Sequence, residues 1–227
     1  MWWCQSPKRW ELAQAPGGAL AVFHCHLGAN TGYQKSEHEM NPEILERNIA
    51  YSGYLTVERL RVRLADGTQV WREVERHGDA AVVLPYDRVR RSALVVRLFR
   101  APVFEASGAA VLEEACAGMI VNEKAESAAR REALEELGVT LHALELVARV
   151  WSSPGVSTER QSLFLASYAT TDRVGRGGGV PSEHEDITVA ERPLAALAAD
   201  VDLGQIADAK LAMLVLALRV RRPELFA

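Results

Sequence analysis

Three glutamates lie close together on a stretch that is expected to form one helix. The stretch covers residues 126–137, and Gly138 follows it as a typical helix C-cap. At about 100° per residue, Glu136 lies about 40° from Glu132, and Glu135 lies about 60° to its other side. A bound divalent cation would relieve the repulsion between these carboxylates, and hard oxygen ligands suit Mg²⁺. The pattern therefore indicates a metal site, although glutamates alone would equally fit a solvated acidic face.

The rest of the same helix is expected to pack on a sheet. Ala129, Ala133, Leu134 and Leu137 are predicted to occupy the arc opposite the glutamates. The carboxylates would then lie on the side of the helix away from that sheet.

The spacing around the helix resembles the Nudix box, Gly-x5-Glu-x7-Arg-Glu-U-x-Glu-Glu-x-Gly-U, in which U is a bulky apolar residue. Here Glu123 is followed by seven residues and then by Arg131-Glu132, and Glu135-Glu136-x-Gly138-Val139 is in register. Two positions depart from the pattern. Four residues lie between Gly118 and Glu123 where the box has five, which leaves the path of this turn open, and Ala133 is small for a U position.

Segments outside the box resemble the ADP-ribose and GDP-mannose pyrophosphatases of the Nudix family. The resemblance implies that the main-chain carbonyl of Ala117 contacts a metal ion. It also implies that Arg100, Glu114, Pro154 and Glu159 contact the substrate. Two plainer interpretations stay open, namely that Arg100 is a surface charge and that Glu159 is a solvated loop residue.

A second acidic segment lies near the C-terminus. Gly177-Gly178-Gly179-Val180 and Glu183-His184-Glu185-Asp186-Ile187 are similar to the mobile loop that brings further carboxylates to the metal ions in this family. The resemblance implies that Glu183 or Glu185 takes a proton from water, and that Glu185 also binds metal. Gly204-Gln205-Ile206-Ala207-Asp208-Ala209-Lys210 is similar to the start of the family's last helix.

The elements that position these residues alternate between strands and helices, which predicts a mixed α/β domain. A hairpin is expected where residues 54–64 meet residues 69–75 across a turn that contains Asp66-Gly67. Strands are also expected at residues 80–85, 93–99, 146–151, 161–168 and 187–190, and helices at 193–201 and 208–220. The resemblance implies a Nudix α/β/α sandwich with a mixed β-sheet, preceded by an N-terminal antiparallel β-hairpin segment.

The chain is expected to divide into three segments. Residues 1–47 are predicted to be a poorly ordered or loosely packed extension, and no function is assigned to them. Residues 48–78 are predicted to be a β segment that forms a homodimer, because this segment commonly packs across a two-fold axis in the branch that the chain resembles. Residues 79–227 are predicted to be the Nudix hydrolase domain.

The composition argues against several kinds of partner. The chain of 227 residues has a net charge of −4, without the basic excess that would favour nucleic acid or an anionic membrane. Its three cysteines are widely spaced, and no apolar run has the length of a membrane span or a signal peptide. We therefore expect a cytoplasmic protein with no nucleic-acid or membrane partner.

The implied reaction is the attack of water on one phosphorus of a P–O–P bridge, with Mg²⁺, or Mn²⁺ in its place, as cofactor. Arg131 is expected to orient a glutamate through a charge-assisted pair, and Glu135 to take part in catalysis. ADP-ribose, cleaved to AMP and ribose 5-phosphate, is the first expected substrate, because Ser153-Pro154-Gly155 resembles the marker of that subgroup. GDP-mannose or another nucleotide sugar stays open, as do a nucleoside triphosphate hydrolase and a non-catalytic module that senses ADP-ribose.

Overall fold

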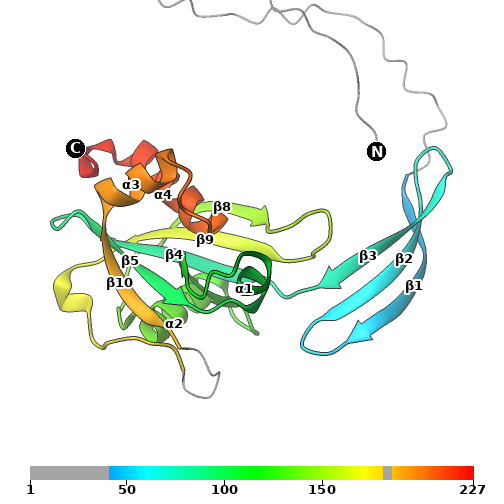
Figure 1. Ribbon diagram of the computed structural model, residues 1–227, viewed down its shortest axis with the longest axis horizontal. Coiled ribbons are helices and arrows are strands. Elements are labelled where there is room, and N and C mark those ends of the chain that lie inside the picture. The colour runs from blue at the N-terminus through cyan, green and yellow to red at the C-terminus, as the bar shows by residue number, and fades with distance from the viewer. Residues whose placement is uncertain (1–40, 181–185) are drawn as a thin grey trace, which may run out of the picture. The chain divides into compact units, whose positions relative to one another are not determined.

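The computed structural model describes residues 41–180 and 186–227 (Figure 1). Most of the predicted extension therefore lies outside the described residues, and so do Glu183 and Glu185. No helix in the described parts of the chain is long and apolar enough to cross a membrane.

The first described strands form a separate antiparallel sheet in the order β1-β2-β3. They are β1 (Glu43–Ser52), β2 (Thr56–Arg63) and β3 (Gln69–Arg76). The predicted hairpin is present as β2 and β3, but β1 was not expected, and the expected boundary after residue 47 falls inside it. The apolar alternation that marks a strand is weak in β1. Ion pairs with β2 help to hold this strand in place. Arg63 lies 2.9 Å from Glu43, and Arg61 lies 3.2 Å from Glu46.

A seven-stranded mixed sheet forms the centre of the domain, in the order β10-β5-β4-β9-β8, with β6 paired to β5 and β7 to β4. Its strands are β4 (Ala80–Asp87), β5 (Ser92–Leu98), β6 (Leu112–Glu114), β7 (Cys116–Met119), β8 (Glu145–Trp151), β9 (Arg160–Ser167) and β10 (Thr188–Pro193). The β4 and β9 pairing is parallel. Strand β4 is buried along its whole length, as its continuous apolar run predicts for a strand covered on both faces.

Strands β4 and β5 separate soon after the turn that joins them, since they pair at two positions next to that turn. Further along, β7 lies against β4, with Ala117 opposite Val82. On the other side, β6 lies against β5, with Glu114 opposite Val96. The short strands β6 and β7 therefore occupy the opening that the two long strands leave.

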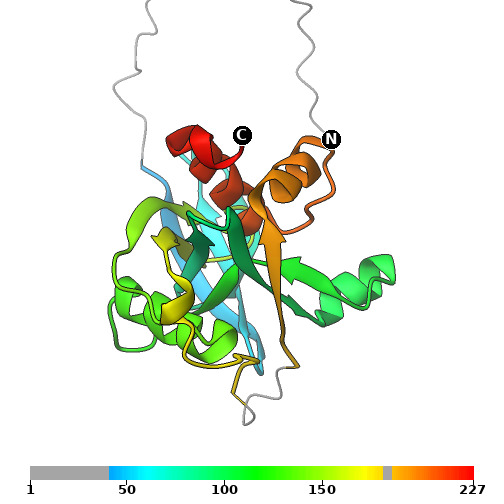
Figure 2. The ribbon, with the colours of Figure 1, turned by 90° about the vertical axis from the view of Figure 1, so that its left-hand side faces the viewer.

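Helices cover both faces of this sheet, which confirms the expected α/β/α sandwich. Figure 1 shows α2 on one side of the sheet and α3 and α4 on the other, and Figure 2 shows the same layers after a quarter turn. The helices are α1 (Ala101–Ser107), α2 (Ala125–Leu137), α3 (Leu194–Asp202) and α4 (Ala209–Arg221), with short 3-10 turns η1 (Thr170–Asp172) and η3 (Pro223–Leu225). Helix α1 was not expected. A proline in its first turn starts it, and Gly108, with φ +74°, ends it.

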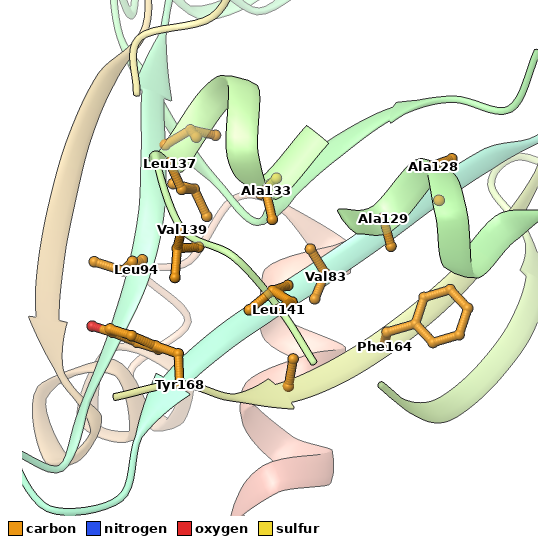
Figure 3. Close-up of a cluster of buried hydrophobic side chains, with 14 of the residues drawn as sticks. Val83, Leu94, Ala128, Ala129, Ala133, Leu137, Val139, Leu141, Phe164 and Tyr168 are labelled. Atoms are coloured by element: carbon orange, nitrogen blue, oxygen red, sulfur yellow. The ribbon is translucent and has the colours of Figure 1, made fainter. Parts of the chain in front are cut away.

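The buried side of α2 differs from the predicted one. Ala129, Ala133 and Leu137 face the sheet as expected, in one buried cluster with Val83, Leu94 and Phe164 (Figure 3). Leu134, however, is 49% exposed, whereas Glu136 is only 3% exposed. The reason is angular: Glu136 lies about 20° from Ala129 around the helix, whereas Leu134 lies about 140° away from it. The helix thus carries one of its carboxylates into the core.

Candidate active site

A cavity of about 840 Å³ borders the opening between β4 and β5. This volume falls within the roughly 300–1,000 Å³ of small-molecule sites. The predicted site residues among its lining are Arg100, Glu114, Ala117, Arg131, Glu132 and Glu159. The cavity is thus lined by positions that the sequence analysis assigned to metal, to catalysis and to substrate.

Two of the box glutamates lie against strand β7. The Oε2 atom of the buried Glu136 accepts a hydrogen bond from the main-chain N–H of Ala117 at 3.2 Å. The carboxylate of Glu132 lies so close to Gly118 that a Cβ atom at that position would be 1.8 Å from Oε1. Glycine at position 118 therefore lets α2 approach the backbone of β7 and brings both carboxylates to this strand.

The third box glutamate, Glu135, pairs with Arg131. Its Oε2 accepts a hydrogen bond from Nη1 of Arg131 at 2.9 Å, one helical turn away. Arg131 also pairs with Glu123 at 3.1 Å and with Glu132 at 2.7 Å. Partial burial by itself would lower the pKa of Arg131, but these three carboxylates raise it, so the guanidinium stays charged. The predicted pairing of Arg131 with a glutamate is present; its catalytic role stays a prediction.

The described residues contain no group of three or more His, Cys, Asp or Glu side chains placed to hold a metal ion. The contacts divide the expected trio only in part. Glu132 and Glu136 lie at β7. Glu132 and Glu135 share Nη1 of Arg131. The donors at β7 are nevertheless carboxylate and carbonyl oxygens, the atoms that Mg²⁺ prefers. Because Mg²⁺ usually keeps several waters and also binds substrate phosphates, a site with two protein carboxylates fits this ion; the expected metal contact of the Ala117 carbonyl stays a prediction.

Another part of the cavity wall carries two cations around a buried carboxylate. Glu114 is 3% exposed and accepts hydrogen bonds from Nε of Arg100 at 2.7 Å and from Nζ of Lys210 at 3.2 Å. Nζ of Lys210 also contacts the buried Asp208, the N-cap of α4, at 2.7 Å. Burial alone would raise the pKa of Glu114, but Arg100 and Lys210 lower it below its ordinary value. The carboxylate is thereby held ionised, and it fixes both cations at the cavity.

A third part of the wall comes from the end of β3 and the loop before β9. The main-chain N–H of His77 donates to Oγ1 of Thr158 at 3.0 Å, and Nδ1 of His77 lies 4.0 Å from Oε1 of Glu159. Gln161 and Tyr54 line the same cavity. Together with Lys210, the residues His77, Gln161 and Tyr54 are lining positions that the sequence analysis did not assign to the site. Lys210 ends a quoted motif, but the other three carry no signal in the sequence.

Other predicted site residues lie elsewhere. Pro154 does not line this cavity. It borders a separate depression with Val74 and Trp151. Glu183 and Glu185 lie outside the described residues, so their predicted roles as base and metal ligand stay predictions.

The chain matches the model of the NUDIX domain over residues 76–208. It is 35% identical over 187 residues to a GDP-mannose pyrophosphatase of Cronobacter sakazakii, which covers 80% of this chain and 97% of the relative. It is 38% identical over 145 residues to a GDP-mannose pyrophosphatase of Pectobacterium atrosepticum, covering 63% of this chain and 74% of the relative. A crystal structure of an ADP compounds hydrolase has the same fold, with a TM-score of 0.67 at 19% identity, over 83% of this chain and 98% of that one.

The chain belongs to the Nudix family. As a Nudix hydrolase it departs from the box pattern at the turn between Gly118 and Glu123, which is one residue short. In the structure, Asn122 takes a left-handed conformation with φ 55°, which asparagine tolerates better than most residues. The main-chain N–H of Ile120 is tied to the carbonyl of Asp79 at 2.8 Å. The short turn therefore still delivers Glu123 to Arg131.

Glu114→Gln tests whether the buried ion pairs stabilise the cavity wall. Removing the charge should lower the free energy of unfolding by about 1–3 kcal/mol at pH 7, because Arg100 and Lys210 lose a charged acceptor. The folded-state pKa of Glu114 lies below the ordinary 4.5, so this stabilisation is complete above pH 4.5 and is lost as the pH falls through the folded-state pKa. Urea denaturation of both proteins from neutral pH to about pH 3 measures the difference.

The exposed Glu105, replaced by Gln, is the matched control and should change stability little at any pH. Equal stability of Glu114→Gln and the parent at pH 7 would show that the network contributes nothing. If the parent and Glu114→Gln still differ by the same free energy of unfolding at about pH 3, the ionisation of Glu114 is not the source of the difference.

Proposed function

We propose that this Nudix hydrolase cleaves the pyrophosphate of a nucleoside diphosphate sugar in a Mg²⁺-dependent reaction. The observation that carries the proposal is the charge pattern of one cavity. Glu132 lies at its metal-binding part, next to the buried Glu136, while Arg100 and Lys210 lie at another part of the wall. Cleavage of a pyrophosphate needs both a metal-binding part and cationic side chains, because the negative charges of the pyrophosphate must be neutralised before water can attack.

The residues of the chain divide the work of this reaction. Glu132, Glu136 and the carbonyl of Ala117 would hold Mg²⁺. When bound, this ion neutralises the phosphates and lowers the pKa of a coordinated water. Arg131 keeps Glu132 in place through their 2.7 Å ion pair.

Substrate orientation and proton transfer fall to other groups. Arg100 and Lys210, held by Glu114, would bind phosphate oxygens and orient the bridge for attack. The base is proposed from the family resemblance as Glu183 or Glu185, which would take the proton from the attacking water.

GDP-mannose is the first candidate substrate. The relatives that carry this name match the chain at 35% and 38% identity, and one of them over nearly its whole length. ADP-ribose, which the sequence analysis put first, is the second candidate, because Ser153-Pro154-Gly155 resembles the marker of that subgroup. A non-catalytic ADP-ribose sensor is less well supported, because every glutamate of the box is present.

A panel of nucleotide sugars and nucleoside triphosphates, assayed with Mg²⁺ and with excess EDTA, tests this proposal. With Mg²⁺, we expect GDP-mannose to give GMP and mannose 1-phosphate, with ADP-ribose slower, and we expect Mn²⁺ to replace Mg²⁺. Chromatographic separation of the products measures each rate. Undiminished hydrolysis in excess EDTA would contradict the metal mechanism. Hydrolysis of triphosphates alone would contradict the substrate class, and a faster rate for ADP-ribose would reverse the order of the two candidates.

We also propose that the protein acts as a homodimer through its N-terminal sheet. Strand β1 exposes Ile44, Ile49 and Tyr51 by 50%, 68% and 58%, and a small antiparallel sheet has little apolar cover of its own. A second copy of the same sheet would cover these side chains.

Light scattering should give twice the chain mass of 24.9 kDa at micromolar concentration. The double variant Ile49→Asp/Tyr51→Ser should shift the mass toward that of the monomer. The control Val89→Asp, at a position that is 92% exposed in the β4–β5 turn, should not. A fully active monomeric parent would contradict the dimer.

A further inference from the structure

The glycine-rich segment Val174–Gly179 lies against the C-terminal end of α2. A helix cannot satisfy its own last carbonyls. In α2, the cap residue Gly138 bonds back to Ala133 and Leu134, which leaves the carbonyls of Glu135 and Glu136 for other donors. The N–H of Gly178 donates to Glu136 at 2.9 Å, and the N–H of Gly179 donates to Glu135 at 3.1 Å.

The contact continues past the end of the helix. The main-chain N–H groups of Val174 and Gly175 both donate to the carbonyl of Gly138, at 2.9 and 3.1 Å. Four main-chain hydrogen bonds therefore join this segment, which we name the glycine clamp, to the end of the helix: two to the last turn of α2 and two to its cap residue Gly138.

The two backbones lie too close together for a side chain at the centre of the clamp. A Cβ atom at Gly177 would lie 2.2 Å from the carbonyl oxygen of Glu136 and 2.7 Å from the carbonyl carbon of Leu137. Gly177 also has φ +68°, a conformation that other residues rarely adopt. Both the close approach and the dihedral angle therefore require glycine at this position.

The clamp binds the main chain of Glu136, the residue whose carboxylate is buried at β7. The carbonyl of Glu136 is held by Gly178, and its carboxylate accepts the N–H of Ala117. Displacing the backbone at this point would move the carboxylate along β7. A metal site tolerates little displacement of this kind, because its ligands must be held within about 0.5 Å of the productive geometry.

We propose that Gly177 is a positioning residue of the metal site, and that the glycine clamp sets the position of the Glu136 carboxylate. The clamp touches neither substrate nor metal, and it acts through the last turn of α2. This inference rests on the proposed function, because it assumes that Glu136 is a metal ligand.

Gly177→Ala tests the inference, with Gly204→Ala as the matched control. Gly204 has nearly the same dihedral angle, φ +67°, but a Cβ atom there would meet nothing within 4 Å. Both variants carry the backbone strain of a left-handed alanine, and only Gly177→Ala also forces the clamp off α2. Mn²⁺ binding, measured from the electron paramagnetic resonance signal of the free ion, reads the metal site without any turnover.

We expect Gly177→Ala to bind Mn²⁺ about 10- to 100-fold more weakly than the parent, the usual effect of losing a group that orients a metal ligand. The Mg²⁺ concentration for half-maximal activity should rise by a similar factor. Gly204→Ala should match the parent in both measurements. Binding by Gly177→Ala within about threefold of the parent, or an equal loss in Gly204→Ala, would overturn the inference.

A measurement on the unaltered protein covers the case in which Gly177→Ala does not fold. Amide hydrogen exchange of Gly178 and Gly179 should be slow, and Mg²⁺ should slow it further, because metal and clamp stabilise the same end of α2. Rapid exchange that Mg²⁺ leaves unchanged would contradict the clamp. If the parent binds Mn²⁺ and cleaves nucleotide sugars but the clamp tests fail, only this inference falls. If the parent binds no divalent cation, the proposed function falls with it.

Discussion

The buried carboxylate of Glu136 is the constraint on which the rest of the site depends. An ionised carboxylate taken out of water loses several kcal/mol of hydration unless charges or hydrogen-bond donors replace it. At 3% exposure, Glu136 is placed among the alanines that pack α2 on the sheet. The N–H of Ala117 supplies one donor. Helix α2 must therefore lie close to β7, and the small side chains of Ala129 and Ala133 together with the absence of one at Gly118 make that approach sterically possible.

The same close approach explains why the site lies at the opening between β4 and β5. The pairing of β4 with β5 ends after two positions, and β7 takes its place beside β4. This arrangement brings the backbone of β7 under α2 on one face of the sheet. It also brings Glu114, at the end of β6, to Lys210 at the start of α4 on the other face. Acidic and basic groups from opposite layers of the sandwich thus border one cavity.

The sequence predicts the layers well because they depend on strong local signals. The apolar run of β4, the hairpin turn at Asp66 and Gly67, and the capped helix that ends at Gly138 are each visible within a few residues. Strand β1 was missed because its apolar alternation is weak. Ion pairs with β2 help to hold it, and the sequence of one strand does not show which strand it will pair with.

The site was predicted less completely, for a reason that lies in side-chain orientation. The box spacing identifies Glu132, Glu135 and Glu136 but not which of them faces the sheet. That orientation follows from the packing of Ala129 and Ala133 on the sheet. It places Glu136 inside the core, whereas Glu135 accepts a hydrogen bond from Arg131. Lining residues such as His77, which follows β3, and Gln161 in β9 reach the cavity only through long-range contacts that no local pattern encodes.

The most direct test of this account is metal binding by Glu136→Gln. Glutamine keeps the size of the side chain and can still accept the N–H of Ala117, but it removes the charge that a cation needs. Titration of Mn²⁺ into this variant, with Glu126→Gln from the first turn of α2 as control, should show a large loss of affinity in Glu136→Gln alone. The turnover number should fall on the order of 10²- to 10³-fold, or roughly 3–4 kcal/mol. Stability without metal should hold or rise, because a buried charge is gone. Unchanged Mn²⁺ affinity with kcat within about threefold of the parent would show that Glu136 is only a buried structural residue, and the account of the site would be wrong.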